Sequence, residues 1–430
     1  MNPLPWTVPW LVARVVAGSA LTCAAVAQPP IPANFAAAPA AASAAAVAPA
    51  ERITMAEALD AAWSRSLEYA ESSGRQRRVQ AEQAVAGSWL AATPMLEMAQ
   101  REGQSSAANG RGRETEVGVA LPLWRPGQRQ LNGQAAEAES VWAAAAERAA
   151  RWRLAAQLRE QAARWRVAET EARQAAQQGQ MLNALATDVD RRVKAGDLAP
   201  ADALAAKAEL LAARAQDREA QQVLQSQRAS WLLLTGMAAL PEAETLQSPQ
   251  GIALDHHPEV VLADAAVQRA RQRVAQVQSQ RAAPPELGLS LRRERPGLGQ
   301  PGQNSAAVSV RLPFGGETHS RPQLAAALAE QDLALASQQR MRQQLASELG
   351  LAHSGLASVT DQAAAEAEGA ALLRERAQLL NTSFLAGESA LPDVLRALGA
   401  ASQAEATAAR RRAALALADA RLQQALGLLP

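Results

Sequence analysis

Two aspartates, Asp202 and Asp393, occupy matching places in two separate segments of this alanine-rich chain. The segments read RVKAGDLAPADAL from Arg192 and FLAGESALPDVL from Phe384, and in each the aspartate follows a glycine by six residues, with a proline shortly before it. Glycine permits the positive φ of a tight turn, and proline is well tolerated in the first turn of a helix. A carboxylate in that first turn is stabilised by the helix dipole, which alone would explain both aspartates.

A second candidate for chemistry is the pair His256 and His257, because imidazole nitrogens bind transition metals. Only Asp255 and Glu259 lie nearby in the sequence, and a structural zinc site needs four ligands. We therefore interpret this segment as a solvated connector. The sequence contains no phosphate-binding loop, no supported Ser-His-Asp arrangement and no metal-ligand cluster, so we predict neither an enzyme nor a cofactor.

The landmarks of the first half recur 191 residues later in the second half. The pairs at this spacing are Gly196 with Gly387, Asp202 with Asp393, Pro94 with Pro285, Leu121 with Leu312, and Gly236 with Gly427. Repetition at one fixed spacing indicates an internal duplication. We predict a first structural repeat over 53–241, a linker over 242–254 and a second repeat over 255–430.

Each half contains a segment with the period of a β-strand. In ELGLSLRRERPG, Leu287, Leu289 and Leu291 share one face, and in the following VSVRLPF the residues Val308 and Val310 do the same. We expect strand pairs within 94–124 and 285–315. Each strand would be about eleven residues long, which is enough to cross a bilayer when tilted.

A long charged and alanine-rich stretch follows each strand pair, over 128–192 and 322–385. A continuous helix of this length would measure roughly 100 Å. The glycine motifs interrupt these helices, which predicts a first tip near 192–204 and a second tip near 383–396. The returning helices would cover about half of each long helix. We expect the helices before the strand pairs, within 55–92 and 258–283, to cover the remainder.

The N-terminal segment has the pattern of an export signal. Residues 1–27 carry one charge, Arg14, then an apolar run and the small-residue site Ala25-Val26-Ala27. A lipidated Cys23 is the alternative, although it lacks the usual leucine three residues earlier. Residues 28–50 form a proline- and alanine-rich leader. The 43 basic and 42 acidic residues are intermixed, which argues against nucleic acid as a partner.

These elements constrain the class of protein. Four bilayer-length strands cannot close a barrel, and an open sheet edge cannot be left in hydrocarbon, so several copies would have to share one barrel. The sequence thus predicts a mainly α protein with a membrane β-region, in which long helical hairpins form a periplasmic tube. The alternative is a soluble periplasmic coiled-coil or adaptor-like structural protein whose apparent strands are loops.

The segments ITMAEALDAAW, VGVALPLWRPGQR, the two tip motifs and LLLTG, in this order, resemble the TolC-like outer-membrane efflux proteins over 53–430. The resemblance implies a homotrimer with a shared twelve-stranded barrel in the outer-membrane lipid of a Gram-negative cell, extending into the periplasm. It also implies two partners, a periplasmic adaptor protein and an inner-membrane pump of the RND type. RETEVGVALPLWRPGQR looks most like the cobalt-zinc-cadmium branch, which implies heavy-metal cations as cargo.

The resemblance also assigns roles to single residues. It implies that the tips dock the adaptor through Gly196, Asp197, Leu198, Asp202, Gly387, Glu388, Ser389 and Asp393. Asp393 matches an aspartate that forms an acidic ring at the pore entrance in some relatives, and such a ring would favour cations. Arg396 replaces a second acid there, and Phe384 and Ser389 replace gate-bonding polar residues. Trp89 and Trp124 fit either an interfacial aromatic girdle or packing against a helix.

Overall fold

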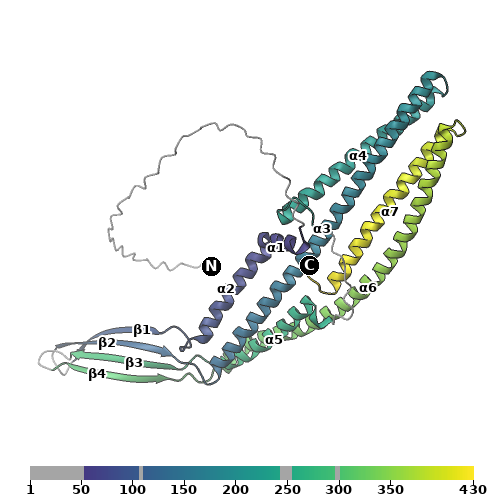
Figure 1. The fold of residues 1–430 in the computed structure, drawn as a ribbon. Helices are drawn as coiled ribbons and strands as arrows, with labels where there is room; N and C mark the ends of the chain where they lie inside the picture. Colours follow the sequence, from purple (N-terminus) through teal and green to yellow (C-terminus); the bar gives the residue numbers. More distant parts are fainter. Residues whose placement is uncertain (1–52, 106–109, 243–253, 296–300) are drawn as a thin grey trace, which may run out of the picture. The chain divides into compact units, whose positions relative to one another are not determined.

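The computed structural model describes residues 53–105, 110–242, 254–295 and 301–430, which belong to one compact unit, 52–430. The predicted signal peptide with Cys23, the leader and most of the linker lie outside the described residues. In chain order the elements are α1 (Met55–Arg65), α2 (Leu67–Gly87), β1 (Met95–Ser105), β2 (Gly110–Pro122), α3 (Gln128–Ala195), α4 (Pro200–Thr235), the short 3₁₀ helix η1 (Leu254–His256), α5 (Pro258–Ser279), β3 (Glu286–Arg295), β4 (Gln303–Arg311), α6 (Glu317–Leu385) and α7 (Leu391–Ala425) (Figure 1).

The four strands form one antiparallel sheet in the order β1-β2-β3-β4 (Figure 1). β2 and β3 join the two halves of the chain, with Val117 opposite Leu291 and Val119 opposite Leu289. The outer strands β1 and β4 each keep one edge without a partner strand among the described residues. A Cβ on Gly288 would lie 2.3 Å from Ser309 Oγ, so the serine side chain of β4 occupies the space beside this glycine.

The helices form two long hairpins, as the sequence predicted. α3 has 68 residues and α6 has 69, so each spans roughly 100 Å at about 1.5 Å per residue. α4 returns along α3 and α7 returns along α6, and each covers about half of its partner (Figure 1). α2 lies along another part of α3, and α5 packs against both α3 and α6. The expected fold of long hairpins and a four-stranded sheet is confirmed.

Two helix boundaries differ from the sequence-based expectation. The helix expected within 55–92 is broken at Ser66, whose extended backbone ends α1 and whose hydroxyl accepts a hydrogen bond from the Tyr69 amide to begin α2. Serine competes well with the helix for backbone groups, which favours such a break. α6 begins five residues before Pro322, because Gly316 in a left-handed conformation lets the chain enter the helix earlier.

The packing between the helices is thin and rich in alanine. One buried cluster joins α1, α3 and α4 around Trp63, Leu158, Trp165 and Trp231. Trp165 and Trp231 meet edge to face with ring centroids 6.3 Å apart, and the Trp231 indole donates to the Ala239 carbonyl. Most of the other buried hydrophobic residues are alanines, which let helix axes approach closely. Among the described residues, none of the helices has the length and apolar character needed to cross a bilayer.

Candidate functional site

The first tip closes α3 with a Schellman motif, a helix end in which two amides bond back to the last turn. Gly196 has a φ of 90°, and its amide donates to the Val193 carbonyl at 3.1 Å. The Asp197 amide donates to the Arg192 carbonyl at 2.9 Å. A non-glycine residue would be strained at this φ, so the glycine is needed for its backbone.

The second tip repeats this geometry at the predicted spacing. Gly387 has a φ of 82°, its amide donates to the Phe384 carbonyl at 3.0 Å, and the Glu388 amide donates to the Ser383 carbonyl at 2.9 Å. Every donor and acceptor lies 191 residues after its counterpart in the first tip. The two tips therefore have the same backbone conformation.

The aspartates in the following helices make different contacts. Asp202 reaches back to the start of α4, where its Oδ2 accepts from the Ala199 amide at 3.3 Å. Asp393 instead pairs with Arg396 one turn later, with Nη1 3.1 Å from Oδ1. Both side chains of the second pair are more than half exposed to solvent. Asp202 thus stabilises a helix start, whereas Asp393 lies at the surface.

The predicted tip residues differ in exposure. Gly196, Asp197, Gly387 and Glu388 are exposed. Leu198 is half-buried against the hydrophobic cluster that lies between the two hairpins. Ser389, at the position that corresponds to Leu198, is half-buried too, and its hydroxyl lies 2.6 Å from that of Ser383.

The sequence did not reveal Arg192 as a contact between the two tips. Its guanidinium lies 5.1 Å from the centre of the Phe384 ring, and its Nη1 donates to the Phe384 carbonyl at 3.3 Å. Nε also pairs with Asp188 at 2.9 Å. A cation at the end of α6 complements the negative end of that helix dipole. Arg192 was visible in the tip motif, but its contact with a segment 192 residues away was not.

A shared hydrophobic cluster joins the two hairpins behind the tips. Its buried members come from four helices: Leu182, Leu185 and Val189 from α3, Ala206, Leu210 and Ala213 from α4, Ala377 and Phe384 from α6, and Leu391, Val394, Ala397, Leu398 and Ala401 from α7. Because both hairpins contribute, the two tips are held side by side in one chain. Separating them would expose this apolar surface to water.

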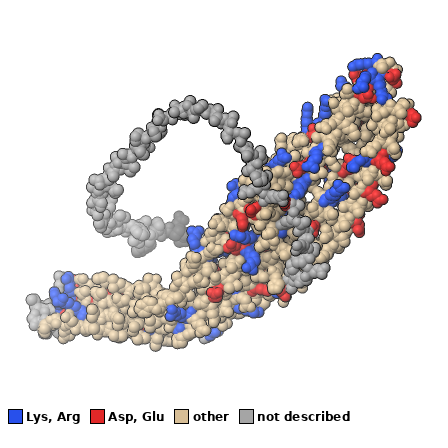
Figure 2. Space-filling view, viewed as in Figure 1, with Lys and Arg blue, Asp and Glu red and all other residues tan. Residues whose placement is uncertain are grey.

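At the other end of the hairpins, the sheet exposes its apolar side chains, whereas the sheet of a soluble protein buries them. We call the face that contains Leu96, Met98, Val117, Val119, Leu289, Leu291, Val308 and Val310 the apolar face, and all of these side chains are exposed. On β3 the exposed and half-buried residues alternate, and Leu289 and Leu291 are among the exposed ones. Figure 2 shows few charged side chains over the middle of the sheet on the side in view.

The opposite, polar face of the sheet carries a small network of ion pairs. Arg292 Nη2 lies 2.8 Å from Glu114, and Arg101 approaches the same carboxylate at 3.5 Å. The Glu114 side chain is only 16% exposed, which favours pairing over solvation. Apolar side chains facing outward and paired charges facing inward are typical of a transmembrane β-barrel wall.

The two tryptophans near the sheet have different surroundings. Trp124 packs at the base of the sheet, where its indole nitrogen donates to the Ser88 carbonyl at 2.9 Å. Trp89 is exposed, and so is Phe314, three residues after the end of β4. Packing therefore accounts for Trp124, while Trp89 and Phe314 have the exposure of interfacial aromatic residues.

The interpretation of His257 as part of a solvated connector was wrong. His257 is buried, its Nδ1 accepts from the Glu259 amide to begin α5, and its ring meets Trp152 edge to face at 4.7 Å. Burial lowers the pKa of this imidazole, which favours its neutral form. His256 is exposed, as expected. The described residues contain no group of three or more His, Cys, Asp or Glu side chains that could hold a metal ion.

Comparisons with known proteins identify the fold. No protein-family model matches the chain, and no curated protein sequence matches it. Solved structures do match. The outer membrane protein VceC from Vibrio cholerae superimposes with a TM-score of 0.70 at 18% identity, over 87% of this chain and 96% of that one. The fold is that of the TolC-like outer-membrane channels.

Two further structures have the same fold. CusC, a protein that forms a transmembrane channel, matches with a TM-score of 0.69 at 16% identity, over 87% of this chain and 93% of its own. The Neisseria gonorrhoeae MtrE outer membrane channel, determined in its open state, matches with a TM-score of 0.67 at 18% identity, over 87% of this chain and 88% of its own. The fold predicted from the sequence motifs is thus confirmed.

Proposed function

We propose that this protein is the outer-membrane duct of a tripartite efflux system, assembled from three copies. The single observation that carries the proposal is the sheet, whose row of leucines and valines is exposed on one face and whose half-buried Glu114 pairs with Arg292 on the other. Exposed leucines and valines in continuous rows are unfavourable in water but stable against lipid tails. They disfavour the alternative of a soluble periplasmic coiled-coil protein.

The two free edges of the sheet support assembly from several copies. β1 and β4 leave backbone amides and carbonyls without a strand partner among the described residues. Such groups cannot remain unpaired in hydrocarbon, and edge-to-edge pairing of β4 with β1 of another copy satisfies both. Three copies give twelve strands, which is wide enough for an open lumen, whereas two copies give only eight.

The tips are the proposed docking surface for the periplasmic adaptor. Asp197 and Glu388 lie exposed at the turns, next to Gly196 and Gly387. Leu198 and Ser389 are half-buried, so they shape the tips and offer only part of their surface. The corresponding inner-membrane partner is an RND-type pump, and the chain itself conducts passively without a cofactor.

The pore entrance is proposed at Asp393 and Arg396. Three copies of an exposed carboxylate around a narrow opening lower the local potential and favour cations, and heavy-metal cations are the proposed cargo. The exposed pair with Arg396 offsets part of that field. The net preference therefore depends on how far the guanidinium stays paired.

Membrane fractionation of cells that express the full chain tests the proposed duct. We expect the protein in the outer-membrane fraction and, after mild detergent extraction, a trimer by native mass spectrometry. Alkaline carbonate should leave it in the membrane, because the apolar face contacts lipid. Recovery as a soluble monomer from the periplasm would contradict the proposal.

A further inference from the structure

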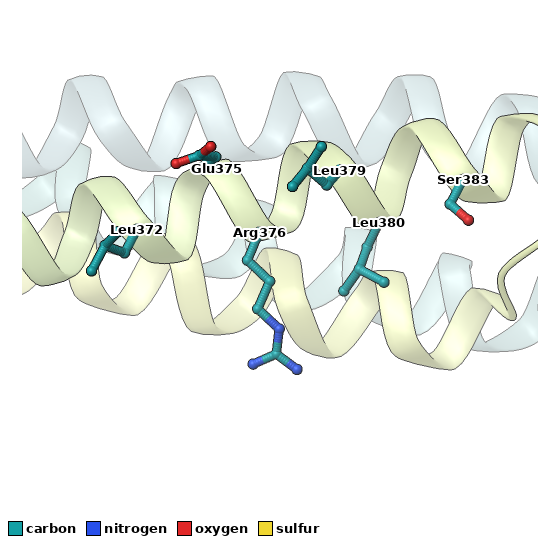
Figure 3. A pocket seen from close by; sticks show the side chains of 6 residues that line it. All are labelled: Leu372, Glu375, Arg376, Leu379, Leu380 and Ser383. Carbon is teal, nitrogen blue, oxygen red and sulfur yellow. The ribbon is translucent and has the colours of Figure 1, made fainter.

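The outward side of α6 near the second tip carries a stripe of leucines and acids. Leu372 is 61% exposed and Leu379 is 66% exposed, and they lie seven residues apart. Glu368 and Glu375 are exposed beside them, again seven residues apart. Figure 3 shows Leu372, Glu375 and Leu379 on successive turns of this helix, where they line a shallow groove. Residues seven apart share one side of a helix.

The outward side of α4 near the first tip carries a matching stripe of leucines and bases. Leu204 is 71% exposed and Leu211 is 55% exposed, at the same spacing of seven. Lys207 and Arg214 are exposed with that spacing too. The buried residues of α4 that pack inside the chain, Ala206, Leu210 and Ala213, lie on the opposite side of the helix.

The two stripes lie at similar distances from the tips. α4 leads away from its tip and α6 leads toward its own, so the two helices would pack antiparallel when placed side by side. Leu204 lies four residues after the start of α4, and Leu379 lies six residues before the end of α6. Leu211 and Leu372 each lie seven residues further from the tips.

One antiparallel register brings all of these residues together. With Leu204 opposite Leu379, the same register places Leu211 opposite Leu372. It brings Lys207 level with Arg376 and within one residue of Glu375. Arg214, which also donates to Asn183 in its own chain, then lies level with Gly369 and within one residue of Glu368. Apolar contacts along the seam and opposite charges beside it are the pattern that fixes partner and register in helix pairs.

These two faces do not meet within one chain. Among the described residues, α4 contacts α1, α3 and α7, whereas α6 contacts α5, α7 and η1. At the other end of the same hairpins, β1 and β4 also each have a free edge. A neighbouring copy that pairs its β1 with β4 would bring its first hairpin alongside α6.

We infer that α6 of one copy packs against α4 of the next near the tips, through Leu379–Leu204 and Leu372–Leu211 contacts. We call this contact the leucine seam. Glu375–Lys207 and Glu368–Arg214 pairs flank it. The inference rests on the proposed assembly of several copies, and it adds which surfaces meet at the entrance. The seam places the first tip of each copy beside the second tip of its neighbour.

A disulfide between copies tests the leucine seam. Leu204→Cys/Leu379→Cys and the control Leu204→Cys/Leu372→Cys, which is one heptad out of register, are oxidised in isolated outer membranes and run on non-reducing gels. We expect covalent dimers and trimers from the first variant, at a yield at least tenfold above the control. The single-cysteine variants show any contribution from Cys23. Equal yields in both variants, or none in either, overturn the seam.

A separate measurement distinguishes failure of the seam from failure of the duct. Native mass spectrometry of the same variants without oxidation reports whether copies associate at all. Trimers without cross-links would overturn the seam and leave the proposed duct intact, whereas monomers would overturn both. Lys207→Glu should lower the cross-linking yield of the first variant severalfold, and adding Glu375→Lys should restore it. No restoration would contradict the charge register.

Discussion

The two tips have the same backbone and different side-chain chemistry. Both end a long helix with a left-handed glycine and the same pair of backbone hydrogen bonds, and both begin the next helix within five residues. Yet Asp202 bonds to its own helix start, while Asp393 forms an exposed pair with Arg396. The same backbone geometry therefore does not require the same side chains, and the two aspartates make separate contacts.

The tips also differ in what they contact. Arg192 of the first tip reaches the carbonyl of Phe384 in the second. The corresponding residue of the second tip is Ser383, whose hydroxyl lies close to that of Ser389 in the same tip. The first tip is therefore coupled to the second by a side chain, and the second has no equivalent contact in return among the residues that are described.

We expect the largest effect from substitution of the tip glycines, which both tips have in common. Gly196→Val and Gly387→Val each force a β-branched residue into positive φ, at a local cost of about 1–3 kcal/mol. A Cβ meets no other atom within 4 Å at either position, so the cost is in the backbone alone. We expect amide exchange at the altered tip to rise by roughly 5- to 150-fold, with loss of export and retention of trimers.

Asparagine at the same two positions is the matched control, because it tolerates the left-handed conformation better than valine. Gly196→Asn and Gly387→Asn should therefore show a smaller rise in amide exchange and retain more export. If the valine variant of one tip exports normally while that of the other does not, the tips are not equivalent docking surfaces.

The next effect concerns the contact that only the first tip makes. Arg192→Ala removes the pair with Asp188 and the hydrogen bond to the Phe384 carbonyl, for a loss of about 1 kcal/mol. We expect amide exchange at Gly387 and Glu388 to rise about fivefold. Ser383→Ala, the change at the corresponding position, should leave the first tip unaffected. Equal effects of both variants on the opposite tip would show that the coupling is symmetric.

Replacing either aspartate by alanine should have a smaller effect on stability, and the effect should differ between the two tips. Asp202→Ala removes the acceptor for the Ala199 amide and should destabilise the first turn of α4 by about 0.5–1 kcal/mol. Asp393→Ala breaks an exposed pair and should change the stability of α7 less. Hydrogen exchange in the first turns of α4 and α7 measures both. A larger loss in α7 would contradict the assignment of the capping role to Asp202.

We expect the smallest change in stability from Asp393→Asn. This variant should instead change ion conduction. This substitution keeps the size of the side chain but removes its charge, so an acidic ring at the entrance should become less selective for cations. Asp202→Asn is the matched control and should leave ion selectivity unchanged. Reversal potentials in a salt gradient measure the difference. Unchanged selectivity in the Asp393 variant would show that Arg396 already neutralises that charge.

Local patterns in the sequence predicted much of this fold. The alternation around Leu289 predicted a strand because Leu287, Leu289 and Leu291 share one face. Gly196 and Gly387 predicted tips because few other residues adopt their φ. Contacts between distant segments could not be predicted in this way. Arg192 meets Phe384, and His257 is buried against Trp152, only after the hairpins have packed.

Single-channel recording in a planar lipid bilayer tests the proposed duct most directly. Purified protein, inserted as a trimer, should produce discrete conductance steps whose reversal potential in a salt gradient is displaced toward the cation equilibrium potential. Arg192→Ala should increase the open fraction, because it loosens the contact between the tips. Insertion without any conductance, with Arg192→Ala silent as well, would contradict the account of a passive duct whose entrance lies at the two tips.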